Sequence, residues 1–350
     1  MKRSVRERAR DVRRLLVAAA RVHRERAAIA EELGRTTGLS AEGIELGFGC
    51  LERDATDAEV DSLVEAAGDA EHVHVVLSAN VFVAPLRALA LARAASARVT
   101  VRPSPRDPAL TRALVRAAGD DALRIVDERD VGALECTEIH AYGSSETVAA
   151  IRARASVGVT VRGHGAGLGV ALVTSGADLD QAADAVASDV VVFDQRGCMS
   201  PRVVLAVGDP ARAEALAVAL DARLSSWGAR VPRGTMSGGE RAEATRWQET
   251  LRFAGRVWAA PDHAVGLGSP GEPLLVPPAG RHLYVAASPS LAEAGARLGP
   301  LAPFIVVVGC DEPAAVRAVA PPGARISELG RMQHPPLDGP VDRRDPALSS

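Results

Sequence analysis

Lysine is almost absent from this sequence of 350 residues. Lys2 is the only one, although lysine and arginine together number 41. A Schiff-base lysine or the phosphate-binding lysine of a P-loop would therefore have to lie at the second residue, outside any folded site. Residues 236–241 are superficially similar to the signature of transporter ATPases, but no such lysine accompanies them. We exclude both kinds of chemistry.

Aromatic residues, cysteines and long apolar runs are also scarce. Aromatics make up 3%, which argues against the stacking platforms that bind nucleic acid, and the net charge of -3 gives no electrostatic basis for such binding. The four cysteines lie far apart, without the spacing of metal ligands or of a disulfide framework. No apolar run approaches the roughly 18 residues of a membrane span, and the N-terminus has a charged pattern without an apolar signal region. We expect a cytoplasmic protein without a nucleic-acid partner, a membrane span or a metal.

Hydrophobic residues make up 47% of the chain, and its length suffices for two domains. Strand and helix patterns alternate with short connections, which predicts an α/β fold with a doubly wound parallel sheet followed by a second α/β unit. We predict helices over residues 3–33, 56–68, 83–95, 108–118, 145–155, 179–188, 210–224 and 240–252, and strands over residues 72–77, 97–102, 122–126, 138–142, 158–162, 170–173, 203–207, 283–286 and 304–308.

The chain is organised around residues 190–202, where an apolar run ends at Asp194 and a short polar turn carries Cys198 at its tip. Pro201 stops any helix, and a new apolar strand follows. A thiol on a loop between two buried elements can be reached by a substrate, and Gly197 lets the backbone approach a ligand closely. The alternative is a small buried hydrophobic residue, which is the commoner fate of a free cysteine.

Polar residues follow three predicted strands at their carboxyl ends, where parallel sheets bind ligands. Asn80 could donate to an oxyanion, or it could be an ordinary helix cap. Arg102 and Arg106 flank a serine and would suit a phosphate, although a solvated turn explains them equally well. Gly143 and Ser144 open a helix and form a generic anion site, while helix capping alone also explains the serine.

The glycine-rich segment 163–169 interrupts the alternation and is interpreted as an interdomain crossing. Its Gly-x-Gly-x-Gly-x-Gly pattern is followed by a strand rather than a helix, so we reject it as a dinucleotide fingerprint. His164 within it could be a base or simply a polar crossing residue. No serine lies in a Gly-x-Ser-x-Gly elbow, which leaves a serine hydrolase without support.

Taken in order, these segments resemble the aldehyde dehydrogenase superfamily. They are most similar to its acyl-CoA reductase branch, which includes the fatty acid reductases of bacterial luminescence. The likeness extends over roughly residues 20–340, and the order and spacing of its motifs make it more specific than any one of them. The motifs that carry it are residues 77–82, 101–104, 142–144, 194–201 and 331–339.

The resemblance implies an aldehyde dehydrogenase-like fold and a role for each motif. Cys198 would be the nucleophile, and Asn80 would lie in the oxyanion hole. The cofactor would be bound by Arg102, Pro103, Ser104 and Arg106 after the second predicted strand of the cofactor domain, and by Gly143 and Ser144 under its pyrophosphate.

Two of the departures from the superfamily pattern bear on the reaction and the cofactor. His164 occupies the place of the general-base glutamate, which an oxidising enzyme needs to activate water. Reducing an acyl thioester needs no water, so this loss favours reduction. Pro105 replaces the carboxylate that binds the cofactor ribose, and together with Arg102 and Arg106 this favours a 2′-phosphate, hence NADP(H).

We therefore expect NADPH-dependent reduction of an acyl-CoA thioester to an aldehyde through an acyl-enzyme on Cys198. Residues 1–163 would form the Rossmann-like cofactor domain, 164–326 the catalytic domain with the site in the interdomain cleft, and 327–350 a return segment and tail. We also expect a homo-oligomer.

Three alternatives to the reductase remain. They are an aldehyde-oxidising dehydrogenase that uses His164 as its base, a homologue that binds a nucleotide without turnover, and a cysteine acyl-hydrolase.

Overall fold

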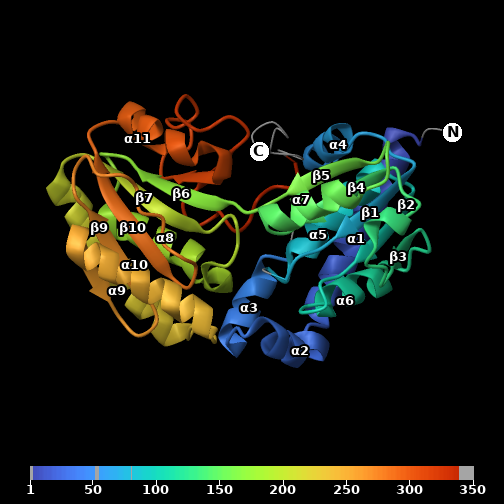
Figure 1. Ribbon diagram of the computed structural model, residues 1–350, viewed down its shortest axis with the longest axis horizontal. Coiled ribbons are helices and arrows are strands. Elements are labelled where there is room, and N and C mark those ends of the chain that lie inside the picture. Colours follow the sequence, from blue (N-terminus) through green and yellow to red (C-terminus); the bar gives the residue numbers. More distant parts are fainter. Residues whose placement is uncertain (1–2, 52–54, 80, 339–350) are drawn as a thin grey trace. The chain divides into compact units, whose positions relative to one another are not determined.

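The computed structural model describes residues 3–51, 55–79 and 81–338, and these divide into two compact units (Figure 1). The first unit contains the described parts of 3–37, 47–166 and 336–338, and the second contains 38–46 and 167–335. The sequence predicted a domain boundary after residue 163, whereas the structure divides the units after residue 166. Residues 327–335, expected in a separate return segment, lie with the second unit.

The first unit contains a five-stranded parallel sheet in the order β3-β2-β1-β4-β5. Because β1 leads outward to β2 in one direction while β4 leads to β5 in the other, right-handed crossovers place the connecting helices on opposite faces. This is the doubly wound arrangement expected from the sequence. The strands are β1 (His72–Val76), β2 (Arg98–Arg102), β3 (Leu123–Ile125), β4 (Glu138–Tyr142) and β5 (Thr160–His164).

The helices of the first unit cover both faces of this sheet (Figure 1). On one face α5 packs against β1 and β2, and on the other α7 packs against β4 and β5. The helical elements are α1 (Val5–Arg24), α2 (Ala27–Thr37), α4 (Asp57–Ala66), α5 (Ala84–Ala95), α6 (Ala109–Ala118), α7 (Ser145–Arg154) and the 3₁₀ turn η1 (Val131–Ala133), while α3 (Ala41–Gly49) spans the division between the units.

The single N-terminal helix predicted over 3–33 is wrong, because the helix breaks between Arg24 and Ala27. The backbone N–H of Arg26 donates to the carbonyl of His23 at 3.4 Å, and its side chain donates to the same oxygen at 3.1 Å. These bonds satisfy a carbonyl of the last turn, as a C-terminal cap does. Neither glycine nor proline marks the position, so the sequence carried no stop signal there.

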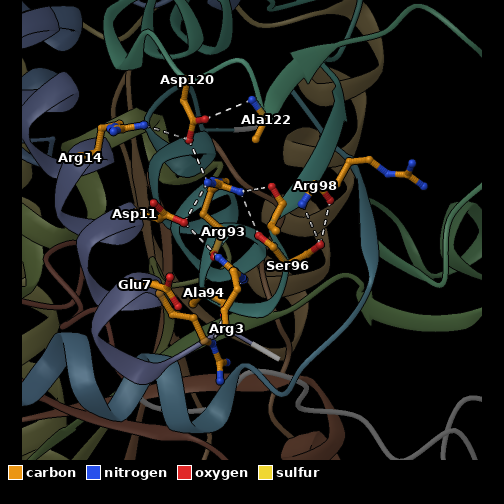
Figure 2. Close-up of polar contacts among 12 residues, drawn as sticks. Arg3, Glu7, Asp11, Arg14, Arg93, Ala94, Ser96, Arg98, Asp120 and Ala122 are labelled. Atoms are coloured by element: carbon orange, nitrogen blue, oxygen red, sulfur yellow. Dashed lines mark hydrogen bonds and ion pairs between the residues drawn. The ribbon is translucent and has the colours of Figure 1, made fainter. Parts of the chain in front are cut away.

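A buried ionic network ties α1 to α5 and to the loop before β3 (Figure 2). Arg93 of α5 is 3% exposed, and its Nη2 lies 2.9 Å from both Asp11 Oδ2 and Asp120 Oδ2. Its Nη1 donates to the carbonyl of Ser96 at 2.9 Å. Arg3 adds a second cation at 3.0 Å from Asp11. Since a buried guanidinium is tolerated only when it is paired, the two carboxylates explain how α5 accepts a charge on its buried face.

The second unit contains a seven-stranded sheet in the order β12-β11-β6-β7-β10-β9-β8 (Figure 1). All neighbouring strands are parallel except β8, which is antiparallel to β9 at one edge. The strands are β6 (Leu168–Val173), β7 (Pro201–Val207), β8 (Gly255–Ala259), β9 (Ala264–Gly268), β10 (His282–Ser288), β11 (Ile305–Cys310) and β12 (Arg325–Glu328), of which β8, β9 and β12 were not predicted.

Apolar clusters on both faces of this sheet hold its helices in place. One cluster is formed with α8 and α9, and the other with α10 and α11. The helix predicted over 210–224 is longer in the structure, since α9 continues through Trp227, whose Nε1 donates to Asp184 of α8 at 3.1 Å. The helical elements are α8 (Leu179–Val191), α9 (Pro210–Arg230), α10 (Gly238–Ala254), α11 (Leu291–Leu298) and the short segments η2 (Val192–Gln195) and η3 (Gly299–Phe304).

Across the described ranges, none of the helices combines the length and the apolar composition that crossing a membrane requires.

Candidate active site

Cys198 lies on a short loop between the end of α8 and the start of β7, in the middle of the second sheet. The thiol is free and half-buried. The loop is closed by a hydrogen bond from the N–H of Ser200 to the carbonyl of Gly197 at 3.2 Å. Cys198 therefore precedes the amino end of β7, while the residues expected to bind the cofactor follow the carboxyl ends of strands in the first sheet.

A left-handed turn separates α8 from residues 196–200, which carry Cys198 and are called the cysteine loop below. Phe193, Asp194 and Gln195 have φ values of 57°, 50° and 63°, a conformation that L-residues other than Asn and Asp rarely adopt. Each such residue costs on the order of 1 kcal/mol or more, so the surrounding contacts must hold the turn in place. Local sequence does not predict this turn, because no glycine occupies these positions.

Asp194 anchors this turn through a buried ion pair with Arg281. The Nε of Arg281 donates to Asp194 Oδ1 at 2.9 Å, and its Nη2 lies 2.7 Å from the same oxygen. The other carboxylate oxygen accepts the N–H of Gly234 at 2.9 Å. Arg281 is 1% exposed and has a φ of 68°, so the ion pair joins two residues that both have left-handed backbone conformations.

Gln195 fixes the other end of the turn and is fully buried. Its Nε2 donates to the carbonyls of Pro201 at 2.7 Å and His282 at 2.6 Å, and its Oε1 accepts the N–H of His282 at 2.8 Å. These bonds span the loop from its first residues to the first residue of β7. They hold Cys198 between two fixed points, which limits its movement during a reaction.

The last of the motifs that carry the family resemblance, described over residues 331–338 and called the closing motif below, contacts the loop that carries Cys198. Gln333 donates from Nε2 to Ser200 Oγ at 3.0 Å and to the carbonyl of Asp189 at 3.2 Å. The Asp189 carboxylate accepts the N–H groups of Gly330 at 2.7 Å and Met332 at 3.0 Å. Two motifs more than a hundred residues apart in the sequence are thus joined in one hydrogen-bonded network around the loop.

The glycine-rich segment approaches the cysteine loop too closely for side chains. The N–H of Gly169 donates to the carbonyl of Ser200 at 3.0 Å, and a Cβ on Gly169 would lie 2.5 Å from the Met199 carbonyl oxygen. A Cβ on Gly167 would lie 2.3 Å from Val306. Close backbone packing beside the thiol therefore accounts for two of the glycines that a dinucleotide motif would otherwise have explained.

His282, whose backbone is hydrogen-bonded to the side chain of Gln195, is buried, and its burial predicts that the protein loses stability at acid pH. Burial lowers the pKa of His282 to about 4, with the charge of Arg233 acting in the same direction. The unfolded chain therefore binds more protons between about pH 6.5 and 4, and stability is lost as the pH falls through that window. We expect the unfolding free energy to decline by up to about 3 kcal/mol from this group.

The measurement is urea unfolding between pH 4 and 7 for the wild type and His282→Gln. The variant should show a shallower loss of stability towards acid pH, whatever its stability at pH 7. Equal slopes for the two proteins would contradict the assignment.

In the first unit, His164 is the last residue of β5 and lies in register with Tyr142 at the end of β4. Their rings are stacked, with centroids 4.2 Å apart and an angle of 4° between the ring planes.

Ser144 caps α7 by accepting the N–H of Thr147 at 3.2 Å, so capping does explain this serine. Pyrophosphate binding by Gly143 and Ser144 stays a prediction, and Asn80 lies outside the described residues.

A cavity of about 490 Å³ lies at the carboxyl ends of β2 and β3. Three of the predicted cofactor residues, Arg102, Pro103 and Ser104, line it. Arg106 is exposed on the same turn and is not among the lining residues, so its role in binding stays a prediction. The remaining lining residues are Pro105, Pro108, Arg112, Asp127 and Arg129.

Sequence reasoning did not single out Arg112, Asp127 and Arg129. Asp127 and Arg129 follow β3, and the rule that drew attention to the carboxyl ends of neighbouring strands could have found them. Arg112 lies in the first turns of α6, where nothing in the local sequence distinguishes it from the many other arginines.

Residues 53–339 match the profile of a protein family described as acyl-CoA reductase (LuxC). The structure is also similar to solved dehydrogenases at identities that show the fold alone. A gamma-glutamyl-gamma-aminobutyraldehyde dehydrogenase from Burkholderia cenocepacia is 15% identical, with a TM-score of 0.71 over 91% of this chain and 76% of that one. An oxidoreductase from Marinobacter aquaeolei is 12% identical, with a TM-score of 0.72 over 94% and 79%.

A third similar structure is the NADP-dependent glyceraldehyde-3-phosphate dehydrogenase from Bacillus halodurans, solved in complex with NADP. It is 13% identical, with a TM-score of 0.68 over 94% of this chain and 80% of that one. No curated protein sequence matches the chain. The family match spans most of the chain, and the fold is that of aldehyde dehydrogenases, as the sequence predicted. The chain therefore belongs to the acyl-CoA reductase (LuxC) family and is an oxidoreductase that acts on aldehyde or acyl groups.

Proposed function

We propose that the protein reduces an acyl-CoA thioester to an aldehyde with NADPH, through an acyl-enzyme on Cys198. The observation that carries the proposal is the half-buried, free thiol of Cys198, held by two buried networks on a loop of a chain in the acyl-CoA reductase family. A structural cysteine would need no such support. A nucleophile does, because misplacement by about 1 Å can cost 10²-fold in rate.

The Cys198 thiolate attacks the carbonyl carbon of the acyl-CoA, and the electron pair of the C=O bond moves to oxygen. The tetrahedral intermediate collapses, the C–S bond to CoA breaks, and CoA leaves as a thiolate. Bound NADPH would supply the hydride that reduces the acyl group. The resulting oxyanion on Cys198 re-forms its C=O bond, breaks the bond to Sγ and releases the aldehyde. The thiolate is thereby regenerated.

Two donors would stabilise the oxyanion in both steps, one from the backbone and one from a side chain. The N–H of Cys198 is carried by the loop that Gln195 and Gln333 hold, so its direction is set before the substrate binds. Asn80 is the second proposed donor. Preorganised donors of this kind are worth about 10²–10³-fold in rate each.

The residues around the arginine cavity fit an anionic cofactor. Arg102 ends β2 and is half-buried, yet within the described ranges no carboxylate lies within 4 Å of its guanidinium. Burial lowers the pKa of Arg102, and the nearby charge of Arg129 lowers it further. A 2′-phosphate would supply the missing anion, so we expect NADPH to bind more tightly than NADH.

The experiment is NADPH oxidation against a panel of acyl-CoAs of different chain length, with the aldehyde trapped and quantified. We expect one aldehyde for each NADPH consumed, with NADH a poorer donor. Omitting the acyl-CoA is the control. Release of a carboxylic acid without NADPH consumption would instead identify an acyl-hydrolase, and NADP⁺ reduction by aldehyde without the reverse reaction would identify an oxidising dehydrogenase.

Replacing His164 with alanine should separate reduction from the chemistries that use water. Because CoA thiolate is already a good leaving group, we expect reduction of the acyl-CoA to stay within a few-fold of the wild type. Loss of a working general base typically costs about 10²–10⁴-fold. NADPH titration shows whether the variant still binds its cofactor. A large loss of reductase activity with binding intact would contradict this expectation and make His164 a catalytic residue.

A further inference from the structure

Arg202 is an extra residue in the pairing between β6 and β7, directly after the cysteine loop. Gly169 of β6 is in register with Pro201 and Val170 with Val203, which leaves Arg202 without a partner in the register. An extra residue of this kind interrupts the alternation of side chains along a strand and re-aims one of them, and such bulges are frequent beside active sites. The bulge therefore gives the first charged residue after Cys198 an orientation of its own.

The guanidinium of Arg202 lacks the counter-ion that a buried charge requires. Its Nε is buried and has no hydrogen-bond partner, and its Nη1 makes a long bond of 3.4 Å to the carbonyl of Pro277. Among the residues that the structure describes, no carboxylate forms an ion pair with Arg202, whereas the buried Arg281 is paired directly with Asp194. An exposed arginine is solvated by water. A buried guanidinium is not, so its cost is offset only when an anion binds to it.

Two negative charges act on Arg202 from a distance, and one of them is the nucleophile. Burial lowers the pKa of Arg202, while the charges of Cys198 and Glu243 oppose that lowering. Glu243 is exposed on α10, so solvent screens its charge. Arg202 itself is half-buried and keeps some accessible surface. The unpaired guanidinium thus lies within electrostatic reach of the sulfur that accepts the acyl group.

The position of Arg202 indicates which part of a thioester would carry the anion. The phosphates of CoA are separated from the thioester by the whole pantetheine arm. A carboxylate at the end of a short acyl chain lies within a few bonds of the carbonyl that Cys198 attacks. A guanidinium can bind such a carboxylate through two parallel N–H···O bonds, whereas a purely apolar chain would leave it unpaired.

We propose that Arg202 binds a carboxylate at the end of the substrate's acyl chain, so that the preferred substrates are CoA thioesters of short dicarboxylic acids. The inference rests on the proposed function and adds the substrate class to it. The product would be an aldehyde that carries a carboxylate at its other end. Because the carboxylate takes no part in the reaction, Arg202 binds the ground state and the transition state alike, and its effect should appear in KM more than in kcat.

Initial rates of NADPH oxidation with pairs of CoA thioesters of equal carbon number test the proposal. The pairs are succinyl and butyryl, glutaryl and pentanoyl, and adipyl and hexanoyl, so that charge varies while chain length is constant. In the wild type, at least one dicarboxylic thioester should exceed its neutral partner in kcat/KM by about 10–100-fold, since a hydrogen bond to a charged group is worth that much. The same preference should appear in the rate of adduct formation on Cys198 without NADPH.

Arg202→Gln should reduce this advantage by about tenfold or more, with the neutral thioester changed by less than about threefold. Arg202→Lys should restore part of the advantage, because it returns the charge without the planar fork. Arg246→Gln is the matched control, since Arg246 is exposed on α10, the helix that carries Glu243. Circular dichroism confirms that each variant is folded.

The proposal is overturned if every neutral thioester reacts as well as its dicarboxylic partner, or if the advantage persists in Arg202→Gln. It is also overturned if Arg202→Gln slows both members of a pair equally. Should that loss be confined to CoA thioesters and spare N-acetylcysteamine thioesters, which lack the phosphates, Arg202 binds a phosphate of CoA instead. These outcomes leave the reductase activity standing, whereas the absence of any acyl adduct on Cys198 would remove the proposed function as well.

Discussion

The Cys198→Ser variant is expected to form no acyl adduct when it is incubated with acyl-CoA, and to lose reductase activity by about 10⁴-fold or more. A serine hydroxyl is a weak nucleophile unless an adjacent base activates it, whereas a thiol is partly ionised near neutral pH. Intact-protein mass spectrometry followed by peptide mapping locates the adduct on the wild type. Cofactor binding should be nearly unchanged, because the arginine cavity belongs to the first unit.

The other three cysteines provide the controls. Burial raises the pKa of the Cys310 thiol to about 12 and also raises the pKa of Cys136, so neither is suited to attack. Cys50 is half-buried like Cys198, and Cys50→Ser is therefore the matched variant, which should keep both adduct and activity. An adduct that survives Cys198→Ser, or that maps to another cysteine, would refute the assignment.

Breaking the Asp194–Arg281 ion pair should have the second largest effect, on stability and on the rate of acylation together. Asp194→Asn leaves the 1%-exposed Arg281 without its counter-charge, and removing one partner of a buried pair costs about 3–5 kcal/mol. The left-handed turn also loses its anchor, so we expect adduct formation at Cys198 to slow by about 10²-fold. Urea unfolding and the time course of adduct formation measure the two effects.

The double variant Asp194→Asn/Arg281→Met separates charge from position. Removing both partners takes away the unpaired buried charge, so stability should recover in part relative to Asp194→Asn. Acylation should stay slow, because the turn then lacks the ion pair at Asp194 and is held by Gln195 alone among the side chains described above. If acylation in Asp194→Asn equals the wild type while the stability falls, the ion pair contributes to folding only and does not position Cys198.

The sequence predicted most of the sheet architecture because buried parallel strands are short apolar runs with sharp boundaries. Strand β2 was predicted over 97–102 and found over Arg98–Arg102, and β7 differs from its prediction by two residues at one end. The strands that were missed are either at edges or rich in glycine: β8 and β12 have mostly half-buried or exposed side chains, and β9 contains glycines. Their apolar pattern is therefore weak.

The supports of the candidate site were less predictable than Cys198 itself. The cysteine loop and the closing motif could be recognised as segments, but their contact through Gln333 and Ser200 depends on the tertiary fold. The left-handed turn at Phe193 is stabilised by long-range contacts against local preference, so local sequence gives no signal for it. Arginine is so common in this chain that its buried members, such as Arg93 and Arg281, could not be told from surface ones.

The most direct test of the account is a two-step single-turnover experiment on the wild type. Acyl-CoA is added first, without NADPH, and the acyl adduct on Cys198 is quantified by mass spectrometry together with the released CoA. NADPH is then added, and adduct, NADPH and aldehyde are followed in time. We predict that the adduct disappears as an equal amount of NADPH is oxidised and an equal amount of aldehyde is formed. An adduct that persists after NADPH addition, or that disappears as carboxylic acid without NADPH oxidation, would contradict the proposed reaction.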